Sequence, residues 1–474
     1  MNRASLLVQP ALRRNLRAIF AEGAAYSVMV GVGETYIPAF VLALGMGEVA
    51  SGLISTIPLL AGGLIQLAAP SGVRRVGSPR TWSLMGAGAQ AAGFVPLAVG
   101  AWIGGMPGAL VFASATLYWG AGMAIGPAWN VWVERLVPPF LRARYFARRS
   151  SVAQLCVLIG LLVGGLTLQF TAAHGKALVG FGILFTLAAA ARFYSIRYFV
   201  IQTDVKPGTF AVRGFPALTL LRKMPSGAGP RLLGYMLALT ATVMIAGPFF
   251  SAYMLRQLAL PYWTYMAIVG TSIAAKVVAL PFLGAFARRF GLGKLLRLAW
   301  VGIMPMAALW LVSDRVEYLI ALQIFSGVAW AAHEYATFLL LFDTIRAEHR
   351  TSVLTAYNLG NAVATVAGSL VGGWLFERVG SGIAGYRTLF AASSLLRLAC
   401  VVLMLQVETG AVPSMRPAFR LIAANPVMGA VLRPILATVR PRPRLVDRVA
   451  AQGPEDAVRV ERIAVHDEQA GKKS

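Results

Sequence analysis

The chain contains twelve apolar segments, each long enough to cross the hydrocarbon core of a bilayer. Such a crossing needs about 20 apolar residues in a helix. Because backbone N–H and C=O groups inside lipid must be paired internally, segments of this length are expected to fold as helices. The segments are 18–44, 48–69, 81–103, 108–133, 150–172, 177–200, 231–255, 261–287, 295–313, 317–343, 351–376 and 386–408.

The composition agrees with a membrane environment. Hydrophobic residues make up 58% of the chain and charged residues only 13%, whereas a soluble domain carries roughly 25% charged residues. The formal net charge is +25, but the basic residues cluster in loops between apolar segments and do not indicate nucleic-acid binding. Cys156 and Cys400 both lie within apolar segments, which predicts packing residues. No metal and no cofactor is expected.

Three short patterns occur twice in the same order, which predicts a duplicated chain. Duplicated, mostly apolar chains are typical of transporters, with a binding site where the halves meet. The paired patterns are a basic turn at 74–80 and 288–294, glycines at 160–165 and 368–373, and a Leu-Phe pair followed by an arginine at 184–192 and 389–397. The expected domains are a six-helix bundle at 1–200, a basic linker rich in Pro and Gly at 201–230, a second bundle at 231–408 and a tail at 409–474.

Lysine and arginine are distributed unequally between the two sets of loops. One set, which includes both termini and the linker, carries more than three times as many basic residues as the other. Basic loops stay on the cytoplasmic side, so both termini are predicted to be cytoplasmic in a multi-pass inner-membrane protein. The tail contains an amphipathic stretch before a polar end that is expected to be disordered, and the basic loops and tail are expected to contact anionic lipid. We expect a monomer.

Six plus six helices, a basic linker and basic turns after helices two and eight resemble the major facilitator superfamily. The turn signature of that family is Gly-x-x-x-Asp-Arg-x-Gly-x-Arg-Arg. In this chain the second turn matches at Gly284, Arg289, Gly291 and Lys294, the first matches more loosely at Arg75, Gly77 and Arg80, and Arg74 and Arg288 replace the aspartate. The resemblance covers about residues 15–408. It implies two pseudo-symmetric six-helix bundles and transport by alternating access.

Other motifs narrow the resemblance to the family. Proton-coupled drug exporters usually have an arginine in helix four, but residues 108–133 contain none. Their helix-five motif has a proline where this chain has Gly165. Typical multidrug antiport is therefore not supported. Residues 126–132 and 142–146 resemble the end of helix four in poorly characterised bacterial members, which suggests a subfamily but no substrate.

Four ionisable residues lie deep within the predicted spans: Glu34, Lys276, His333 and Glu334. Placing an ionisable side chain at membrane depth costs roughly 2.5–3.5 kcal/mol of insertion free energy, so such residues usually have a function or a buried partner. Lys276 and Glu334 lie at similar depths, similar enough for a salt bridge between them. The functional interpretation is that the four bind substrate or carry a coupling proton, and the alternative is a static ion pair or a satisfied polar contact.

Aromatic and amide side chains are candidates for a cavity lining, which would favour an organic substrate. Each is alternatively a lipid anchor or a packing residue. They are Tyr36, Trp119, Asn130, Tyr253, Trp330, Asn358 and Asn361. Arg192 and Arg397, at equivalent places in helices six and twelve, are interpreted as structural.

The missing turn aspartates suggest a substitute cytoplasmic gate. Glu134 and Asp343 end helices four and ten, 209 residues apart. We hypothesise that Glu134 pairs with Arg74 or Arg75, and Asp343 with Arg288 or Arg289, as a latch of the closed state. The alternative is that both acids merely offset the surrounding arginines.

The leading hypothesis is a secondary transporter, a permease that moves a small organic solute and is driven by an ion gradient, with the proton favoured. No nucleotide-binding loop of the Gly-x-x-x-x-Gly-Lys-Ser/Thr type occurs. A membrane enzyme is disfavoured because the chain lacks paired metal-binding histidines and a Gly-x-Ser-x-Gly elbow. A non-transporting receptor or scaffold with the same fold is the remaining alternative.

Overall fold

The computed structural model describes residues 10–204, 228–344, 350–380 and 382–407. Within these residues, twelve helical stretches are long and apolar enough to cross a membrane. Each overlaps one of the segments predicted from the sequence, so the all-α fold is confirmed. The tail at 409–474 and most of the predicted linker lie outside the described residues.

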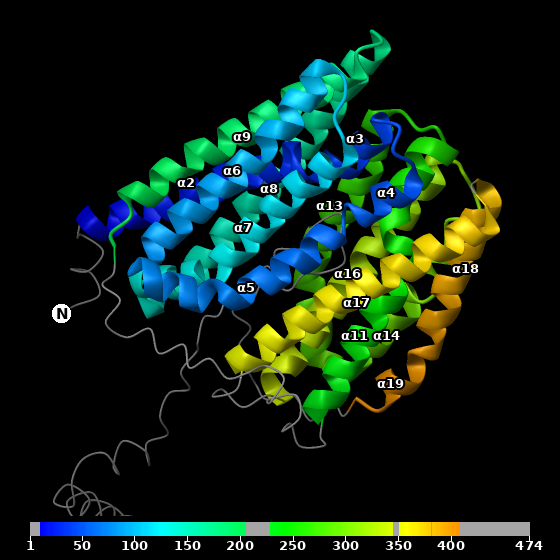
Figure 1. The fold of residues 1–474 in the computed structure, drawn as a ribbon. Helices are drawn as coiled ribbons and strands as arrows, with labels where there is room; N and C mark the ends of the chain where they lie inside the picture. The colour runs from blue at the N-terminus through cyan, green and yellow to red at the C-terminus, as the bar shows by residue number, and fades with distance from the viewer. Residues whose placement is uncertain (1–9, 205–227, 345–349, 381, 408–474) are drawn as a thin grey trace, which may run out of the picture. The chain divides into compact units, whose positions relative to one another are not determined.

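The first half runs from blue to green in Figure 1. Its elements are α2 (Pro10–Val32), η1 (Glu34–Tyr36), α3 (Ile37–Ala43), α4 (Glu48–Leu53), α5 (Ile57–Val76), α6 (Pro79–Ile103), α7 (Gly108–Leu136), α8 (Pro139–Ala173) and α9 (Ala177–Ile201). Together they supply the first six spans.

The second half runs from green to orange and supplies the other six spans. Its elements are α11 (Ala228–Ala246), η2 (Gly247–Phe249), α12 (Phe250–Ala252), η3 (Tyr253–Gln257), α13 (Tyr262–Phe290), α14 (Leu292–Ile303), α15 (Met306–Leu309), α16 (Val316–Thr344), α17 (Arg350–Val379), α18 (Ile383–Ala399) and α19 (Val401–Leu405).

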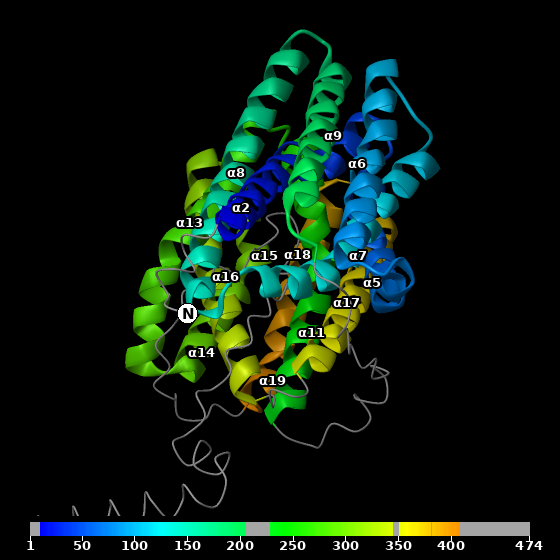
Figure 2. The same ribbon diagram turned by 90° about the vertical axis from the view of Figure 1, so that its left-hand side faces the viewer.

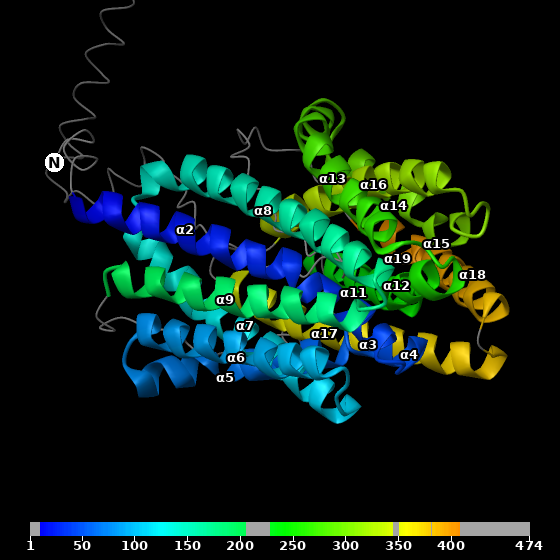
Figure 3. The ribbon, with the colours of Figure 1, turned by 90° about the horizontal axis from the view of Figure 1, so that it is seen from above.

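Helix packing repeats from one half to the other. In the first half α2 packs against α8 and α9, which run alongside it in Figure 3, and α7 packs against α5 and α6. In the second half α11 packs against α17 and α18, and α16 packs against α13 and α14. The same pairs of helices are in contact in both halves, so the duplication seen in the sequence is a duplication of structure.

The repeated glycines lie where two helices come closest. A Cβ on Gly160 of α8 would lie 3.1 Å from the Cα of Gly31 on α2. In the second half, a Cβ on Gly368 of α17 would overlap the carbonyl oxygen of Ala241 on α11. Small residues let helix backbones approach this closely in lipid. The glycine pattern therefore serves the same helix contact in each half.

The two halves meet through α8 against α13 and through α5 against α17, contacts that can be followed in Figures 1 and 2. The last glycine of each repeat also lies where the halves meet, Gly165 of α8 against α13 and Gly373 of α17 against α4. A Cβ on Gly165 would lie 3.0 Å from Cβ of Met266, and a Cβ on Gly373 would lie 3.3 Å from Cγ1 of Val49. Both residues touched belong to the opposite half, so the glycine repeat also keeps the interface between the halves close.

Two polar contacts join the halves as well. The hydroxyl oxygens of Thr56 and Ser369 lie 2.8 Å apart in a buried hydrogen bond. Arg256 donates from Nη2 to the carbonyl oxygen of Leu42 at 2.6 Å. Leu42 and Arg256 end the first spans of their halves. The contact between Arg256 and Leu42 therefore lies near helix ends remote from the basic turns at 74–80 and 288–294, whereas Thr56 and Ser369 lie well inside the spans Glu48–Ala69 and Tyr357–Val379.

The first span of each half is interrupted. In the first half, α2 gives way to the 3₁₀ turn η1 and then α3, and Pro38 at the start of α3 has no N–H to donate. In the second half, α11 gives way to η2 at Gly247 and Pro248, followed by the π-helical turn η3. Interrupted helices in membrane proteins are tolerated where they are buried in protein or line a cavity. Glu34 lies at the first interruption.

Large apolar side chains are exposed on many of the spans. Ile103 is 78% exposed, Phe282 71% and Phe170 68%. Soluble monomers rarely expose large contiguous apolar patches. Such a surface is suited to contact with lipid. Polar side chains that could have a function therefore lie in the interior.

Candidate functional site

An ion pair links two helices of the second half at membrane depth. Nζ of Lys276 on α13 lies 2.7 Å from Oε1 of Glu334 on α16. The Glu334 side chain is 6% exposed and that of Lys276 is 18% exposed. The salt bridge predicted from the similar depths of these residues is confirmed. Both charges are largely removed from water, and each makes the other tolerable in this place.

His333 lies beside this ion pair and is also buried. Its ring centroid is 5.8 Å from the ring of Tyr235 on α11 and 5.8 Å from that of Trp330. Nε2 of His333 and the hydroxyl of Tyr235 are buried without a hydrogen-bond partner among the described residues. Buried polar atoms are normally paired. Two orphaned groups on adjacent rings indicate a place where a water or a ligand is to be bound.

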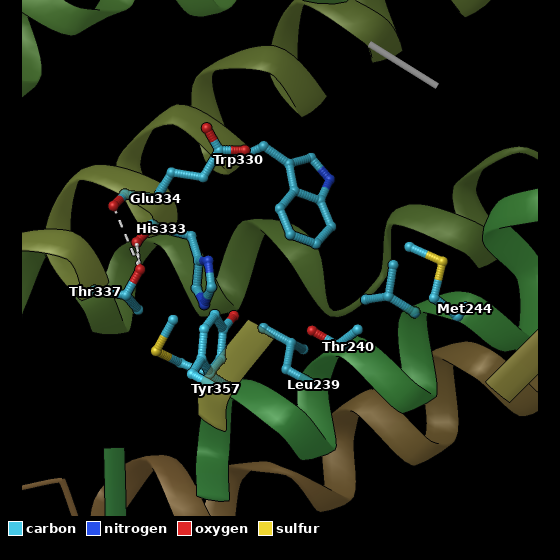
Figure 4. Close-up of a pocket in the computed structure, with 10 residues that line it drawn as sticks. Leu239, Thr240, Met244, Trp330, His333, Glu334, Thr337 and Tyr357 are labelled. Carbon is cyan, nitrogen blue, oxygen red and sulfur yellow. Dashed lines mark hydrogen bonds between the residues drawn. The ribbon is translucent and has the colours of Figure 1, made fainter. Parts of the chain in front are cut away.

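A small cavity of about 30 Å³ opens between α11, α16 and α17 at this point (Figure 4). Figure 4 shows Trp330, His333 and Glu334 on one helix, with Tyr357 from another helix close to the histidine ring. A water needs roughly 10–15 Å³ of such volume, so the cavity has room for water but is too small for an organic solute in this conformation. It is lined by Met236, Leu239, Thr240, Val243, Met244, Trp330, His333, Glu334, Thr337 and Tyr357.

Amide and hydroxyl groups extend the polar region along α11 and α17. Thr240 donates to Oδ1 of Asn361 at 2.9 Å, and the Tyr357 hydroxyl donates to the same oxygen at 3.4 Å. Asn361 is buried and Asn358 is half-buried. Of the predicted lining residues, Trp330 lines the cavity and Asn361 bonds to two of the residues that line it.

The first-half candidates lie elsewhere. Glu34 is buried and accepts a hydrogen bond at Oε2 from the Tyr118 hydroxyl of α7. Trp119 is buried with its ring against Tyr118. The Tyr36 hydroxyl donates to the carbonyl oxygen of Leu161 on α8. The structure thus places Glu34 in a polar contact between α7 and the broken first span.

Tyr36 and Tyr253 are packing residues in this structure rather than cavity-lining ones. Tyr36 fills the space beside Gly164, where a Cβ would lie 2.5 Å from its ring. The Tyr253 hydroxyl donates to Oδ1 of Asp314 at 3.2 Å, at the end of its span. Asn130 is half-buried in α7. Neither tyrosine contributes to the cavity beside His333.

The gate residues have other contacts than the predicted latch. Glu134 forms a 3.0 Å ion pair with Arg142 of α8, and Arg74 donates to the Ser71 hydroxyl on its own helix. Arg75 is exposed. Arg142 is therefore a competing partner for Glu134, one that sequence spacing did not suggest.

The second-half latch is only partly visible. Arg289 is exposed, with its guanidinium over the Phe290 ring at 5.2 Å. The side chains of Arg288 and Asp343 lie outside the described residues. The latch as a whole stays a prediction.

The sequence interpretation missed a charge cluster in the first half. Glu22 of α2 pairs with Arg149 of α8 at 3.1 Å and with Arg192 of α9 at 3.3 Å. Glu22 lies inside an apolar segment, and that signal was available. Arg149 lies at the edge of its segment and was counted among the loop arginines. Arg397 follows the prediction of a structural role, since it donates to the Ile303 carbonyl oxygen at 3.1 Å.

Comparisons with known proteins bear on the fold. Residues 231–445 match the family model described as Major Facilitator Superfamily. No curated protein sequence matches the chain. The structure is similar to the nucleoside transporter NupG, with 11% identity, a TM-score of 0.61, and 84% of this chain and 100% of that one covered.

Two further solved structures are similar to the chain. A mutant of NupG has 12% identity and a TM-score of 0.62, with 82% of this chain and 99% of that one covered. A bacterial homologue of the human lysosomal transporter Spinster, in an inward-facing and occupied conformation, has 13% identity and a TM-score of 0.61, with 84% and 95% covered. Residues 231–445 thus match the Major Facilitator Superfamily by sequence, and the chain shares its fold with these transporters.

Proposed function

We propose that the chain is a secondary active transporter that moves a small organic solute by alternating access, coupled to protons. The observation that carries the proposal is the buried Lys276–Glu334 ion pair beside the partnerless Nε2 of His333. Ionisable groups at membrane depth are costly and mark substrate or proton pathways. A pair held between two different helices can open when Glu334 takes up a proton or when a solute replaces one partner, and this would couple binding to helix movement.

The size of the cavity supports a second conformation. At about 30 Å³ it admits water but no organic solute, so binding requires α11, α16 and α17 to separate. The contact between the halves at Leu42 and Arg256 lies at the helix ends remote from the basic turns, and the contact at Thr56 and Ser369 lies inside the spans. Opening and closing these ends in turn is the movement that alternating access requires, and a ligand drives it by binding one state more tightly.

The side chains around the cavity favour an organic solute. Trp330 and Tyr357 present flat rings, while Thr240 and Glu334 offer hydrogen-bonding groups. Small-molecule sites combine apolar walls with a few placed polar groups in this way. A bare inorganic ion would leave the aromatic surface unused.

The distribution of basic residues supports the membrane placement that we propose. The chain is a multi-pass protein of the inner membrane with both termini in the cytoplasm, because the loops on that side carry most of the lysine and arginine. The same loops and the tail contact anionic lipid. The monomer holds both halves of the site.

Transport by purified protein in proteoliposomes tests the proposal. Nucleosides, amino acids, sugars and organic acids are offered with and without a pH gradient, and solute uptake and internal pH are both recorded. We expect one class to enter with protons, Glu334→Gln to abolish this coupled uptake, and Glu317→Gln, an exposed acid on the same helix, to retain it. Uptake that ignores the pH gradient would remove the proton from the proposal, and no uptake of any class would reject transport.

A further inference from the structure

A second group of buried charges, none of which lines the cavity, lies in the first half. Glu22 is 4% exposed and Arg192 is 2% exposed, while the Arg149 side chain keeps 14% of its surface. Oε2 of Glu22 pairs with Nη2 of Arg149, and Oε1 pairs with Nη1 of Arg192. One carboxylate therefore serves two guanidinium groups, and these three residues together carry one excess positive charge.

The surroundings of Arg149 suit a guanidinium in both shape and hydrogen bonding. Its Nε donates to the carbonyl oxygen of Ile19 at 3.2 Å, and its Cζ lies 4.7 Å from the ring centroid of Trp129 on α7. Beneath it is Gly23, where a Cβ would lie 2.5 Å from Nη2 and 2.6 Å from Nε. Glycine at this position leaves room for the guanidinium to lie against α2. The remaining exposure of Arg149 makes it the member of the cluster that a ligand can reach.

The cluster also has donors without acceptors. Nε of Arg192 and Nε1 of Trp129 are buried and have no hydrogen-bond partner among the described residues. Leaving such groups unpaired is costly. Tyr145 does not supply the missing negative charge, because burial raises the pKa of its phenol and its hydroxyl donates to the carbonyl oxygen of Leu16. An anion would balance the excess positive charge and accept hydrogen bonds from the two N–H groups that lack a partner.

We propose that Arg149, Arg192 and Trp129 form a subsite for the anionic group of the transported solute, a carboxylate or a phosphate. This inference rests on the proposed function and names the substrate class, an organic anion. Arg149 turns from Glu22 to the ligand, and Glu22 remains paired with Arg192, so no carboxylate is left buried alone. A planar guanidinium suits both acids because it can donate two parallel hydrogen bonds.

Binding to the purified full chain in detergent tests the subsite without any transport step. Benzoate and inorganic phosphate are titrated separately at constant ionic strength with chloride as the background anion, and thermal unfolding and tryptophan fluorescence are recorded. Trp129→Phe identifies the part of the fluorescence signal that comes from Trp129. We expect at least one probe to raise the unfolding temperature saturably and to change that signal. A response to benzoate alone assigns the site to carboxylates, and a response to phosphate alone assigns it to phosphates.

Three variants decide between a built site and attraction by the basic surface. Arg149→Gln removes the guanidinium, and Gly23→Ala displaces it, because the three atoms nearest to the new methyl group all belong to the flexible Arg149 side chain. Each is expected to weaken binding by about tenfold or more, as loss of a charge-assisted pair does. Arg197→Gln removes an exposed arginine of the same half and is expected to leave binding unchanged.

The subsite is rejected if neither probe binds saturably, or if Arg149→Gln binds within about twofold of the unchanged chain. Equal losses in Arg149→Gln and Arg197→Gln would also reject it, because general charge would then explain the binding. Since these measurements need no gradient, anion binding without uptake would reject the transport proposal alone. Proton-coupled uptake of an uncharged solute, with no anion bound, would reject the subsite alone.

Discussion

Glu22 and Glu334 are both buried carboxylates, but their surroundings differ. Glu334 has one cationic partner, Lys276, at 2.7 Å, whereas Glu22 has two arginines. Loss of the Glu334 charge would leave one lysine that is 18% exposed, whereas loss of the Glu22 charge would leave two arginines without their shared partner. The proposed proton coupling therefore assigns the change of charge to Glu334.

Removing one partner of the second-half ion pair should be worse than removing both charges. Lys276→Ala leaves the Glu334 carboxylate buried alone, and we expect a loss of about 3 kcal/mol of stability. Adding Glu334→Gln should restore much of that loss, because no uncompensated charge then remains. Thermal and denaturant unfolding in detergent measure the cycle, with Lys294→Ala, an exposed lysine, as the control. Strictly additive effects would show that the two residues are not energetic partners.

At the scale of the helix, the glycines allow neighbouring helix backbones to approach closely. A Cβ on Gly31 would lie 2.5 Å from the carbonyl oxygen of Val157, which is backbone and cannot swing aside. A Cβ on Gly88 of α6 would meet no other atom within 4 Å. Both glycines lie in helices, so a change to alanine raises the helix propensity equally at each. The two positions differ only in which atoms the new methyl group contacts.

We expect Gly31→Ala to lower stability by about 1–3 kcal/mol, the usual cost of overpacking. Gly88→Ala should be neutral or stabilising by up to about 1 kcal/mol, because alanine favours the helix more than glycine does. Unfolding temperatures of the two variants, compared in the same detergent, check the prediction. Equal responses would mean that α2 and α8 are not held together at this crossing.

Helix interruptions were harder to foresee than helix contacts. Prolines at 38 and 248 lie inside long apolar segments, and the sequence alone permits either a kinked or a broken helix there. The structure breaks both first spans into shorter pieces, since the neighbouring helices cover the freed backbone groups. Because the two halves are related, a proline at an equivalent place in each first span predicts a similar interruption in both.

At the scale of the whole molecule, the orientation that we propose rests on the charge of the loops. Single cysteines at Gly47, Gly105 and Ser313, in a background without Cys156 and Cys400, should react with an impermeant maleimide from outside. Cysteines at Ser78, Gly208 and Gly293 should react only after the membrane is opened. Labelling of Gly208 from outside would overturn the six-plus-six arrangement.

The contact between the halves should be movable during transport. With hydroxyl oxygens 2.8 Å apart, cysteines at Thr56 and Ser369 are within reach of a disulfide. Oxidation of the double variant should stop uptake, and a reducing agent should restore it, because the proposed alternating access requires the halves to part here. Each single-cysteine variant is the control. Full uptake by the cross-linked protein would show that the two halves stay together at Thr56 and Ser369 throughout the cycle.

The sequence by itself determined what a linear pattern encodes: twelve spans, two related halves and the salt bridge between Lys276 and Glu334. Span length and hydropathy depend only on neighbours along the chain, and residues at equal depth in adjacent helices can be matched by counting. Tertiary structure decided the remainder. That Tyr36 packs beside Gly164 and that Glu134 pairs with Arg142 depend on how helices rotate about their axes and on which side chains reach across. The charge cluster at Glu22 unites three helices far apart in the chain, and only their packing brings its two arginines to one carboxylate.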